Sequence, residues 1–221
     1  MTKISEVKEY YGKTLQQSSD LKTNACCTIK VYPDHIKQAM SQIHDEVHNR
    51  YYGCGLTIPT ELSGMKVLDL GSGAGRDCFI LSKLVGQEGE VVGVDMTKEQ
   101  LDVANKHIDF HTQTFGYTKP NTRFIEGDIA KLNECDLQDN YFDAIVSNCV
   151  INLCEDKAAV LDEAYRVLKE GGELYFSDVY SDRRISEELK NDKVLWGECL
   201  SGALYWNDFL SLAKRSGFAD P

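Results

Sequence analysis

The chain has 221 residues, 42% of them hydrophobic and 10% aromatic, so it is long enough for one globular domain with an added segment. Its formal net charge of −11, with no Lys/Arg-rich run, argues against a protein that binds nucleic-acid phosphates. The first residues lack the apolar core of a signal peptide, and no apolar run is long enough to cross a membrane. We therefore expect a cytoplasmic protein with no nucleic-acid or membrane partner.

Residues 1–62 predict a cap of helices and loops rather than part of a sheet. An amphipathic helix at the start leads into a polar stretch that contains Cys26. A second helix is expected from about Asp34, followed by a glycine-containing loop with Cys54. His44 and His48 are one helical turn apart and could chelate a metal. Because no carboxylate-rich motif accompanies them, we expect a solvated helix face instead.

From Ser63 onward, short strand patterns alternate with helical patterns, which is typical of a parallel sheet flanked by helices. The expected strands cover residues 66–70, 90–94, 123–125, 142–147 and 172–177. The expected helices cover residues 97–115, 156–168, 186–196 and 207–215, and Thr97 with Gln100 could form a capping box at the start of the first of these. The sequence thus predicts an α/β fold with a doubly wound, mostly parallel sheet. Its last strand would be an open edge, so residues 63–221 look like a domain that lacks its C-terminal strands.

A glycine-rich loop follows the first expected strand directly and precedes a helix. Its glycines are Gly71, Gly73 and Gly75, with Ser72 between the first two. Such a loop lets the backbone turn tightly and lets a ligand approach where a Cβ would clash, although many structural turns look similar. Asp69, on the strand itself, would bring negative charge near the ligand, which disfavours a pyrophosphate and tolerates a cation.

Carboxylates end the next two expected strands. Asp95 lies 20 residues after Gly75, the separation at which an acidic side chain meets ribose hydroxyls, and Asp128 follows the third strand and suits an adenine amino group. Together these features fit an adenosyl ligand without phosphates. Over about residues 60–180 the pattern resembles the class I S-adenosylmethionine-dependent methyltransferases, which have a Rossmann-like fold. The resemblance implies S-adenosylmethionine as cofactor, bound by Tyr52, Asp69, Gly71, Ser72, Gly73, Gly75, Asp95, Met96, Asp128, Ile129 and Asn148.

Eight cysteines are many for a chain without a secretion signal, and we expect them to be reduced thiols. No Cys-x-x-Cys pair is present, so a structural zinc site is not indicated. Cys149 directly follows the fourth strand, where it would lie beside the cofactor or, alternatively, be a buried thiol. Cys199 fits a pocket wall, and Cys26 and Cys54 lie in expected loops. We assign a structural or incidental place to Cys78, Cys135 and Cys154, and we give no role to Cys27, which adjoins Cys26.

Four cysteine motifs, in order, give a closer resemblance, to the arsenite methyltransferases. They are residues 23–26, 51–56, 147–153 and 196–206, accompanied by 71–78 and 94–97. The resemblance implies four catalytic cysteines: Cys26, Cys54, Cys149 and Cys199. In that family, Cys149 and Cys199 would hold trivalent arsenic, with Cys54 either joining them or pairing with Cys26.

The resemblance also implies that methylation is coupled to thiol oxidation, with a Cys26–Cys54 disulfide later reduced by thioredoxin or glutathione. Arsenic(III) is soft and prefers thiolates, and its lone pair can accept a methyl group without a general base. We expect a monomer. Two alternatives remain: a methyltransferase for an organic small molecule with structural cysteines, and a non-catalytic arsenic or redox sensor.

Overall fold

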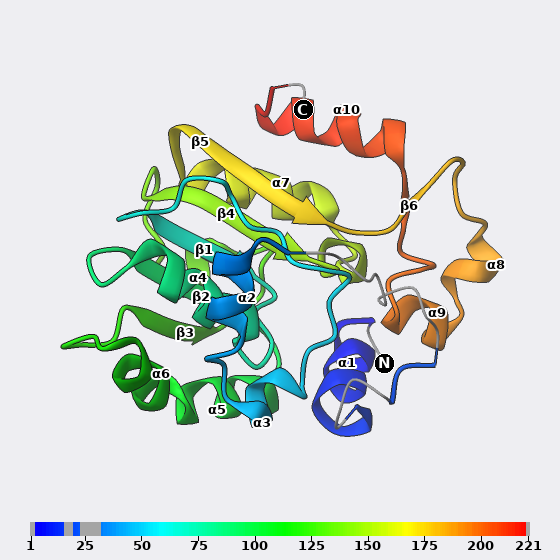
Figure 1. The fold of residues 1–221 in the computed structure, drawn as a ribbon. Coiled ribbons are helices and arrows are strands. Elements are labelled where there is room, and N and C mark those ends of the chain that lie inside the picture. Colours follow the sequence, from blue (N-terminus) through cyan, green and yellow to red (C-terminus); the bar gives the residue numbers. More distant parts are fainter. Residues whose placement is uncertain (1–2, 16–19, 23–31, 220–221) are drawn as a thin grey trace.

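A five-stranded parallel sheet forms the centre of the molecule, as a computed structural model of residues 3–15, 20–22 and 32–219 shows (Figure 1). Its strand order is β3-β2-β1-β4-β5, and every neighbouring pair is parallel. The strands are β1 (Lys66–Leu70), β2 (Glu90–Asp95), β3 (Thr122–Glu126), β4 (Phe142–Asn148) and β5 (Leu168–Ser177). The predicted doubly wound α/β fold is confirmed, and the strand order reverses direction between β1 and β4.

Helices cover both faces of this sheet. Alternate residues of β1 point to opposite faces: Val67 packs in one cluster with Leu81 of α4, and Leu68 packs in another with Val160 of α7. Both faces of β1 are therefore buried, which is why the strand is a nearly continuous apolar run. The helices around the sheet are α4 (Arg76–Val85), α5 (Lys98–Lys106), α6 (Ile108–Phe115), α7 (Lys157–Val167) and α10 (Trp206–Ser216), with short 3₁₀ turns η3 (Leu132–Cys135) and η4 (Ile151–Leu153).

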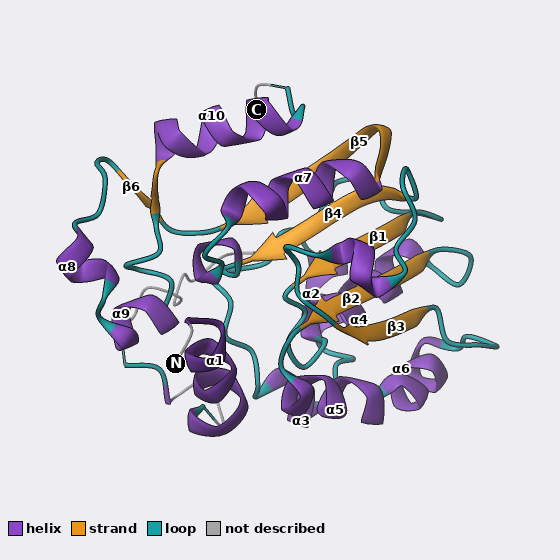
Figure 2. Cartoon of the chain, turned by 180° about the vertical axis from the view of Figure 1, so that it is seen from behind, coloured by secondary structure: helices purple, strands orange, loops and turns teal. Residues whose placement is uncertain are grey.

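The remaining elements lie mainly beyond the carboxyl ends of β4 and β5, where α1 and α9 lie side by side (Figures 1 and 2). A two-stranded parallel ribbon, β6 with β7, accompanies them. These elements are α1 (Lys3–Glu9), the π-helical turn η1 (Tyr10–Thr14), β6 (Tyr180–Ser181), α8 (Glu187–Lys190), α9 (Lys193–Gly197) and β7 (Leu204–Tyr205). Two further N-terminal helices, α2 (Asp34–Met40) and α3 (Asp45–His48), pack against α4 and α5 respectively.

The single helix expected over residues 97–115 is wrong, because the chain leaves helical geometry at His107 and forms α5 and α6 instead. His107 hydrogen-bonds Glu46 through its ring and accepts a bond from the His111 ring through its carbonyl. The capping box is also wrong. Thr97 occupies the N-cap position without a side-chain cap bond, and Gln100 donates to the carbonyl of Tyr11.

Two other boundaries differ from the sequence prediction. Strand β5 begins at Leu168, directly after α7 ends at Val167, so residues 168–171 extend the strand rather than the helix. The helix expected over 186–196 is divided into α8 and α9, because the Asp192 carboxylate accepts hydrogen bonds from two backbone N–H groups and starts a new helix there. As predicted, β5 is an edge strand of the sheet.

Among the helices of the described residues, none combines the length and apolar character needed to cross a bilayer.

Candidate cofactor cavity and cysteine cluster

A cavity of about 310 Å³ opens at the carboxyl ends of the strands, next to the point where the strand order reverses. Open α/β sheets bind their ligands at this place. The cavity brings together every residue of the predicted cofactor set except Gly75, and Cys149 lies in the same wall. The members of that set that line it are Tyr52, Asp69, Gly71, Ser72, Gly73, Asp95, Met96, Asp128, Ile129 and Asn148.

Gly71 and Gly75 of the glycine loop are glycines for two different structural reasons. Gly71 has a φ of +76°, and a Cβ there would overlap the Val150 side chain beside the cavity. Gly75 has a φ of +86° and is the N-cap of α4, and a Cβ there would press on Phe124 of β3. Gly75 thus lets α4 pack closely on the sheet, which explains why it does not line the cavity.

Two carboxylates at the cavity, Asp69 and Asp95, differ in their surroundings. Burial, together with the nearby Asp77 carboxylate, raises the pKa of Asp69 to about 8, and the Cys78 thiol donates to it at 3.2 Å. Asp69 is therefore largely protonated near pH 7 when no cation is bound, and the expected fixed negative charge is absent in that state. The Asp95 carboxylate accepts from the backbone N–H of Gly73 at 2.9 Å and of Thr97 at 2.8 Å, so it also holds the glycine loop.

Several cavity residues were not identified from the sequence. Arg76 is 6% exposed, and its Nε has no hydrogen-bond partner among the described residues, while its guanidinium lies 3.7 Å from the centre of the Tyr51 ring. Gln100 and Val150 also line the cavity. The position of Arg76 directly after the glycine loop could have identified it as a cavity residue. Gln100 was missed because its spacing from Thr97 indicated a helix cap instead.

The N-terminal elements form one side of the cavity. Tyr11 of η1 lines it, and its ring lies edge-on to that of Tyr52 with centroids 5.6 Å apart. The Tyr11 hydroxyl donates to the carbonyl of Gly197 at 2.9 Å, and the Tyr10 hydroxyl donates to Glu198 at 2.8 Å. Because Cys199 follows these two acceptors, the same turn contacts both the cofactor cavity and the segment with Cys199.

Three of the predicted cysteines come together. Cys54, Cys149 and Cys199 belong to one buried cluster with Val7, Leu153 and Trp196. Cys54 and Cys149 are joined in a disulfide, and the Cys199 thiol donates to the carbonyl of Cys149 at 2.8 Å.

This pairing differs from the reduced thiols expected from the sequence and from the Cys26–Cys54 disulfide that the family resemblance implied. Its local cause is the contact between residues 51–55 and the end of β4. There the backbone N–H of Cys54 donates to the Asn148 side chain at 3.0 Å. Cys26 lies outside the described residues.

The backbone of two of these cysteines is unusual. Cys149 has a φ of +56° and Cys199 a φ of +64°, a left-handed conformation that costs a residue with a Cβ roughly 1–2 kcal/mol. The other non-glycine residues with positive φ in the described chain are Asp136 and Asn140, types that adopt it readily. Strain at two cysteines in one cluster is characteristic of a functional site.

The cysteines assigned a structural place have environments that disfavour the thiolate. Burial raises the pKa of Cys154 to about 12, and burial with Asp69 nearby raises the pKa of Cys78 well above its ordinary value. Cys135 is only partly buried, and its pKa is also raised. Thiols of this kind are poor nucleophiles and poor ligands at neutral pH.

The cavity fits an adenosyl cofactor that carries an amino-acid end. The buried Arg76 Nε and Ser72 Oγ, both without hydrogen-bond partners among the described residues, are donors suited to carboxylate and hydroxyl oxygens. Gly71 leaves room for close approach, and Asp69 can ionise when a positive charge arrives. The apolar walls near Ile129 and Met96 suit a purine ring.

The sheet order and the cavity at its reversal point define a Rossmann-like α/β protein, a class that binds its ligands at this point of the sheet. A family model described as a methyltransferase domain matches residues 61–217, and the chain belongs to this methyltransferase family.

Its sequence is similar to those of arsenite methyltransferases, as the cysteine motifs indicated. The protein of that name from Aquipseudomonas alcaligenes is 61% identical over 97% of this chain and 62% of its own length. The human arsenite methyltransferase is 54% identical over 98% of this chain and 58% of its own length.

A solved structure is similar as well. The crystal structure of an arsenic(III) S-adenosylmethionine methyltransferase from Chlamydomonas reinhardtii superposes with a TM-score of 0.82 at 50% identity, covering 86% of this chain and 64% of that one. The chain spans about three fifths of the length of these relatives.

Proposed function

We propose that this protein transfers a methyl group from S-adenosylmethionine to trivalent arsenic held by cysteine thiolates. The observation that carries the proposal is the convergence of Cys54, Cys149 and Cys199 in one cluster, with Cys149 in the wall of the cofactor cavity. The similarity to arsenite methyltransferases over nearly the whole chain supports the choice of acceptor.

The cofactor would supply a methyl group on a positively charged sulfur. In the proposal, Asp69 faces that cationic end, Arg76 donates to the carboxylate of the amino-acid end, and Asp95 binds the ribose hydroxyls while holding the glycine loop. Asp128 and Ile129 surround the base. The residues then act by positioning, which can contribute on the order of 7–11 kcal/mol when reactants are well aligned.

Arsenic would be held by Cys149 and Cys199, with Cys54 as a third ligand. Arsenic(III) binds deprotonated sulfur, so the Cys54–Cys149 disulfide must be reduced before both can act as ligands. A thiol reductant such as thioredoxin or glutathione is therefore part of the proposal. The Cys149 carbonyl already accepts from the Cys199 thiol, which keeps the two residues adjacent in the oxidised form.

The electrons balance through the thiols. When the arsenic lone pair forms a bond to the methyl group and the sulfur–methyl bond breaks, arsenic changes from the +3 to the +5 state. Two thiolates that close to a disulfide supply two electrons and return it to +3. Thioredoxin, through its dithiol, or two molecules of glutathione then reduce that disulfide and are oxidised to a disulfide in turn. The ability of Cys54 to pair with Cys149 supports a role for Cys54 in this cycle.

The test is incubation with arsenite, S-adenosylmethionine and a thiol, followed by chromatographic speciation of arsenic. We expect methylated arsenic from the wild-type chain and none from Cys149→Ser or Cys199→Ser. Cys135→Ser is the matched control, because its partly buried thiol lies outside the cluster and its loss should leave turnover intact. Equal product from Cys149→Ser and Cys135→Ser would refute arsenic ligation by Cys149.

A further inference from the structure

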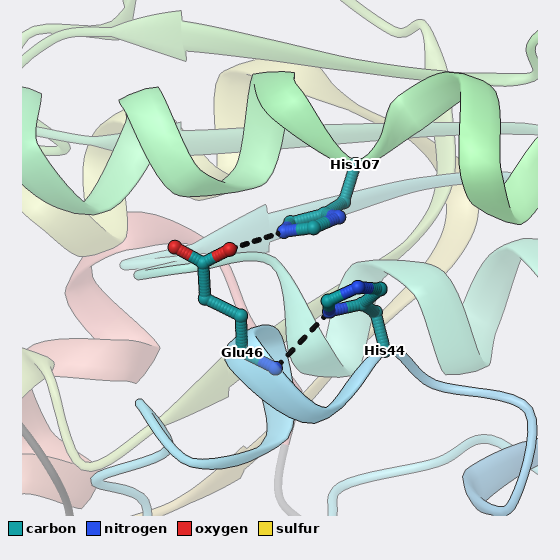
Figure 3. A group of neighbouring side chains, drawn as sticks. All are labelled: His44, Glu46 and His107. Atoms are coloured by element: carbon teal, nitrogen blue, oxygen red, sulfur yellow. Dashed lines mark hydrogen bonds and ion pairs between the residues drawn. The ribbon is translucent and has the colours of Figure 1, made fainter.

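A second group of potential ligands lies away from the cysteines, where the N-terminal segment meets the junction of α5 and α6. His44, Glu46 and His107 each offer a ligand atom, and these atoms lie within 4.8 Å of one another (Figure 3). The His107 Nε2 is 2.8 Å from a Glu46 carboxylate oxygen, and the His44 and His107 rings stack with centroids 3.8 Å apart. His48, which the sequence paired with His44, is exposed and does not belong to the group.

The two histidines are fixed relative to each other by a third. The backbone N–H of His44 donates to Nε2 of His111 at 3.2 Å, and Nδ1 of His111 is 2.7 Å from the carbonyl of His107. His111 is itself buried and stacks on Phe79 at 3.7 Å between centroids. One imidazole ring thus connects the backbones of both histidines, in the way that a neighbouring group orients the ligands of a metal site.

The group is also open to an ion from solvent. Glu46 is about one third exposed, and Lys106, whose ammonium is 2.6 Å from its carboxylate, has a side chain that is 63% exposed. A long exposed lysine can swing into water at little cost, since surface ion pairs contribute little. The Lys106 ammonium beside Glu46 shows that a positive charge can reach this carboxylate from the solvent side.

We propose that His44, Glu46 and His107 form a binding site for a borderline transition-metal ion, Zn²⁺ in particular. Two imidazole nitrogens and one carboxylate oxygen are a ligand set suited to zinc, with water completing four-coordination. The ion replaces Lys106 at Glu46 and joins α3 to the α5–α6 junction. The site is separate from the cysteine cluster, so its occupancy does not depend on the redox state of the thiols.

The experiment is titration of the purified chain with ZnCl₂ by isothermal calorimetry, with the Cys54–Cys149 disulfide intact and the remaining accessible thiols alkylated, so that thiolates do not compete. We expect one site that weakens about 10- to 100-fold in His44→Asn, in Glu46→Gln and in the orienting-residue variant His111→Gln. His44→Asn keeps a side chain able to cap α3, where His44 now accepts from the backbone N–H of Glu46. The matched control is His35→Asn, which removes an exposed histidine outside the group and should bind like wild type.

Two further measurements separate a site from a damaged fold. Lys106→Gln removes the competing cation and should bind Zn²⁺ severalfold more tightly, a gain that misfolding cannot produce. Co²⁺ bound at the site should show visible d–d bands without the near-ultraviolet band of cobalt–thiolate. Equal Zn²⁺ affinity and stoichiometry in wild type, Glu46→Gln and His35→Asn, or a thiolate band with Co²⁺, would overturn the proposal.

Discussion

Individual residues at the cavity and in the cysteine cluster have properties set by their surroundings rather than by residue type. Asp69 is an aspartate whose pKa is raised to about 8 by burial, and Cys149 and Cys199 are residues with a Cβ in a backbone region suited to glycine. The sequence placed Asp69, Cys149 and Cys199 in the candidate site. It could not give the protonation state or the backbone strain, because both arise from packing that brings distant segments together.

The protonation of Asp69 predicts how the affinity for S-adenosylmethionine depends on pH. Below its raised pKa the Asp69 carboxyl is neutral. It must therefore lose its proton before it can pair with the positive charge of a ligand. Affinity should therefore rise as pH increases from 6 to 8, by at most about tenfold per pH unit, and level off above that range. Titration calorimetry at several pH values measures the slope.

S-adenosylhomocysteine is the matched ligand, because it lacks the sulfonium charge and should show a shallower slope. Asp69→Asn should flatten the slope for S-adenosylmethionine. The same slope for both ligands would show that Asp69 does not titrate with the cofactor charge.

The left-handed conformation of Cys199 predicts that a glycine variant is more stable than an alanine variant at this position. Cys199→Ala and Cys199→Gly both remove the thiol, but only glycine adopts a φ of +64° without strain. We expect the glycine variant to be more stable than the alanine variant by about 1 kcal/mol, opposite to the order in regular helices and strands. Urea unfolding under reducing conditions checks this, and an alanine variant that is the more stable would argue against strain at Cys199.

At the scale of elements, the sequence predicted the helices and strands that form because of residues close together in the chain. Strands β1, β2 and β4 are near-continuous apolar runs between turn signals, and they form where expected. The interruption at His107 was not predictable, since its ring bonds to Glu46, which lies 61 positions away on another element. The contact of η1 with α9 was likewise hidden, because it joins residues 186 or more positions apart.

The contact between η1 and α9 predicts that the N-terminal turn contributes to cofactor binding. Tyr11 supplies an aromatic wall to the cavity, so Tyr11→Ala should weaken S-adenosylmethionine binding by roughly three- to tenfold, the range for a lost aromatic contact. Tyr11→Phe keeps the ring and loses the bond to Gly197, so its effect should be smaller. If both variants lost the same amount of affinity for S-adenosylmethionine, the Tyr11 hydroxyl rather than its ring would be responsible for the contribution to binding.

At the scale of the whole molecule, residues from three distant parts of the chain meet at the cysteine cluster. The Cys54–Cys149 disulfide joins residues 95 positions apart and so links the N-terminal segment to the end of β4. The sequence motifs indicated which cysteines to choose, but their convergence depends on the sheet order, which places β4 beside β1.

The disulfide predicts a large effect of reduction on stability. Closing a loop of this length restricts the unfolded chain and should stabilise the oxidised form by about 4 kcal/mol, which corresponds to a melting temperature roughly 10 °C higher than in the reduced form. Differential scanning calorimetry with and without reductant measures the difference. Cys54→Ser should melt at one temperature in both conditions, whereas Cys135→Ser should keep the difference.

Asn148 connects the two halves of the site through a single amide. Its oxygen accepts from the backbone of Cys54, its nitrogen donates to Tyr51 at 2.7 Å and to Asp77 at 3.1 Å, and Cys149 is its neighbour in the chain. Because Asn148 also lines the cavity, a ligand that hydrogen-bonds to this amide would compete with its bond to the Cys54 backbone. Under the proposed function, nucleoside binding in the cavity and arsenic binding at the thiols should therefore be thermodynamically linked, each changing the dissociation constant of the other by the same factor.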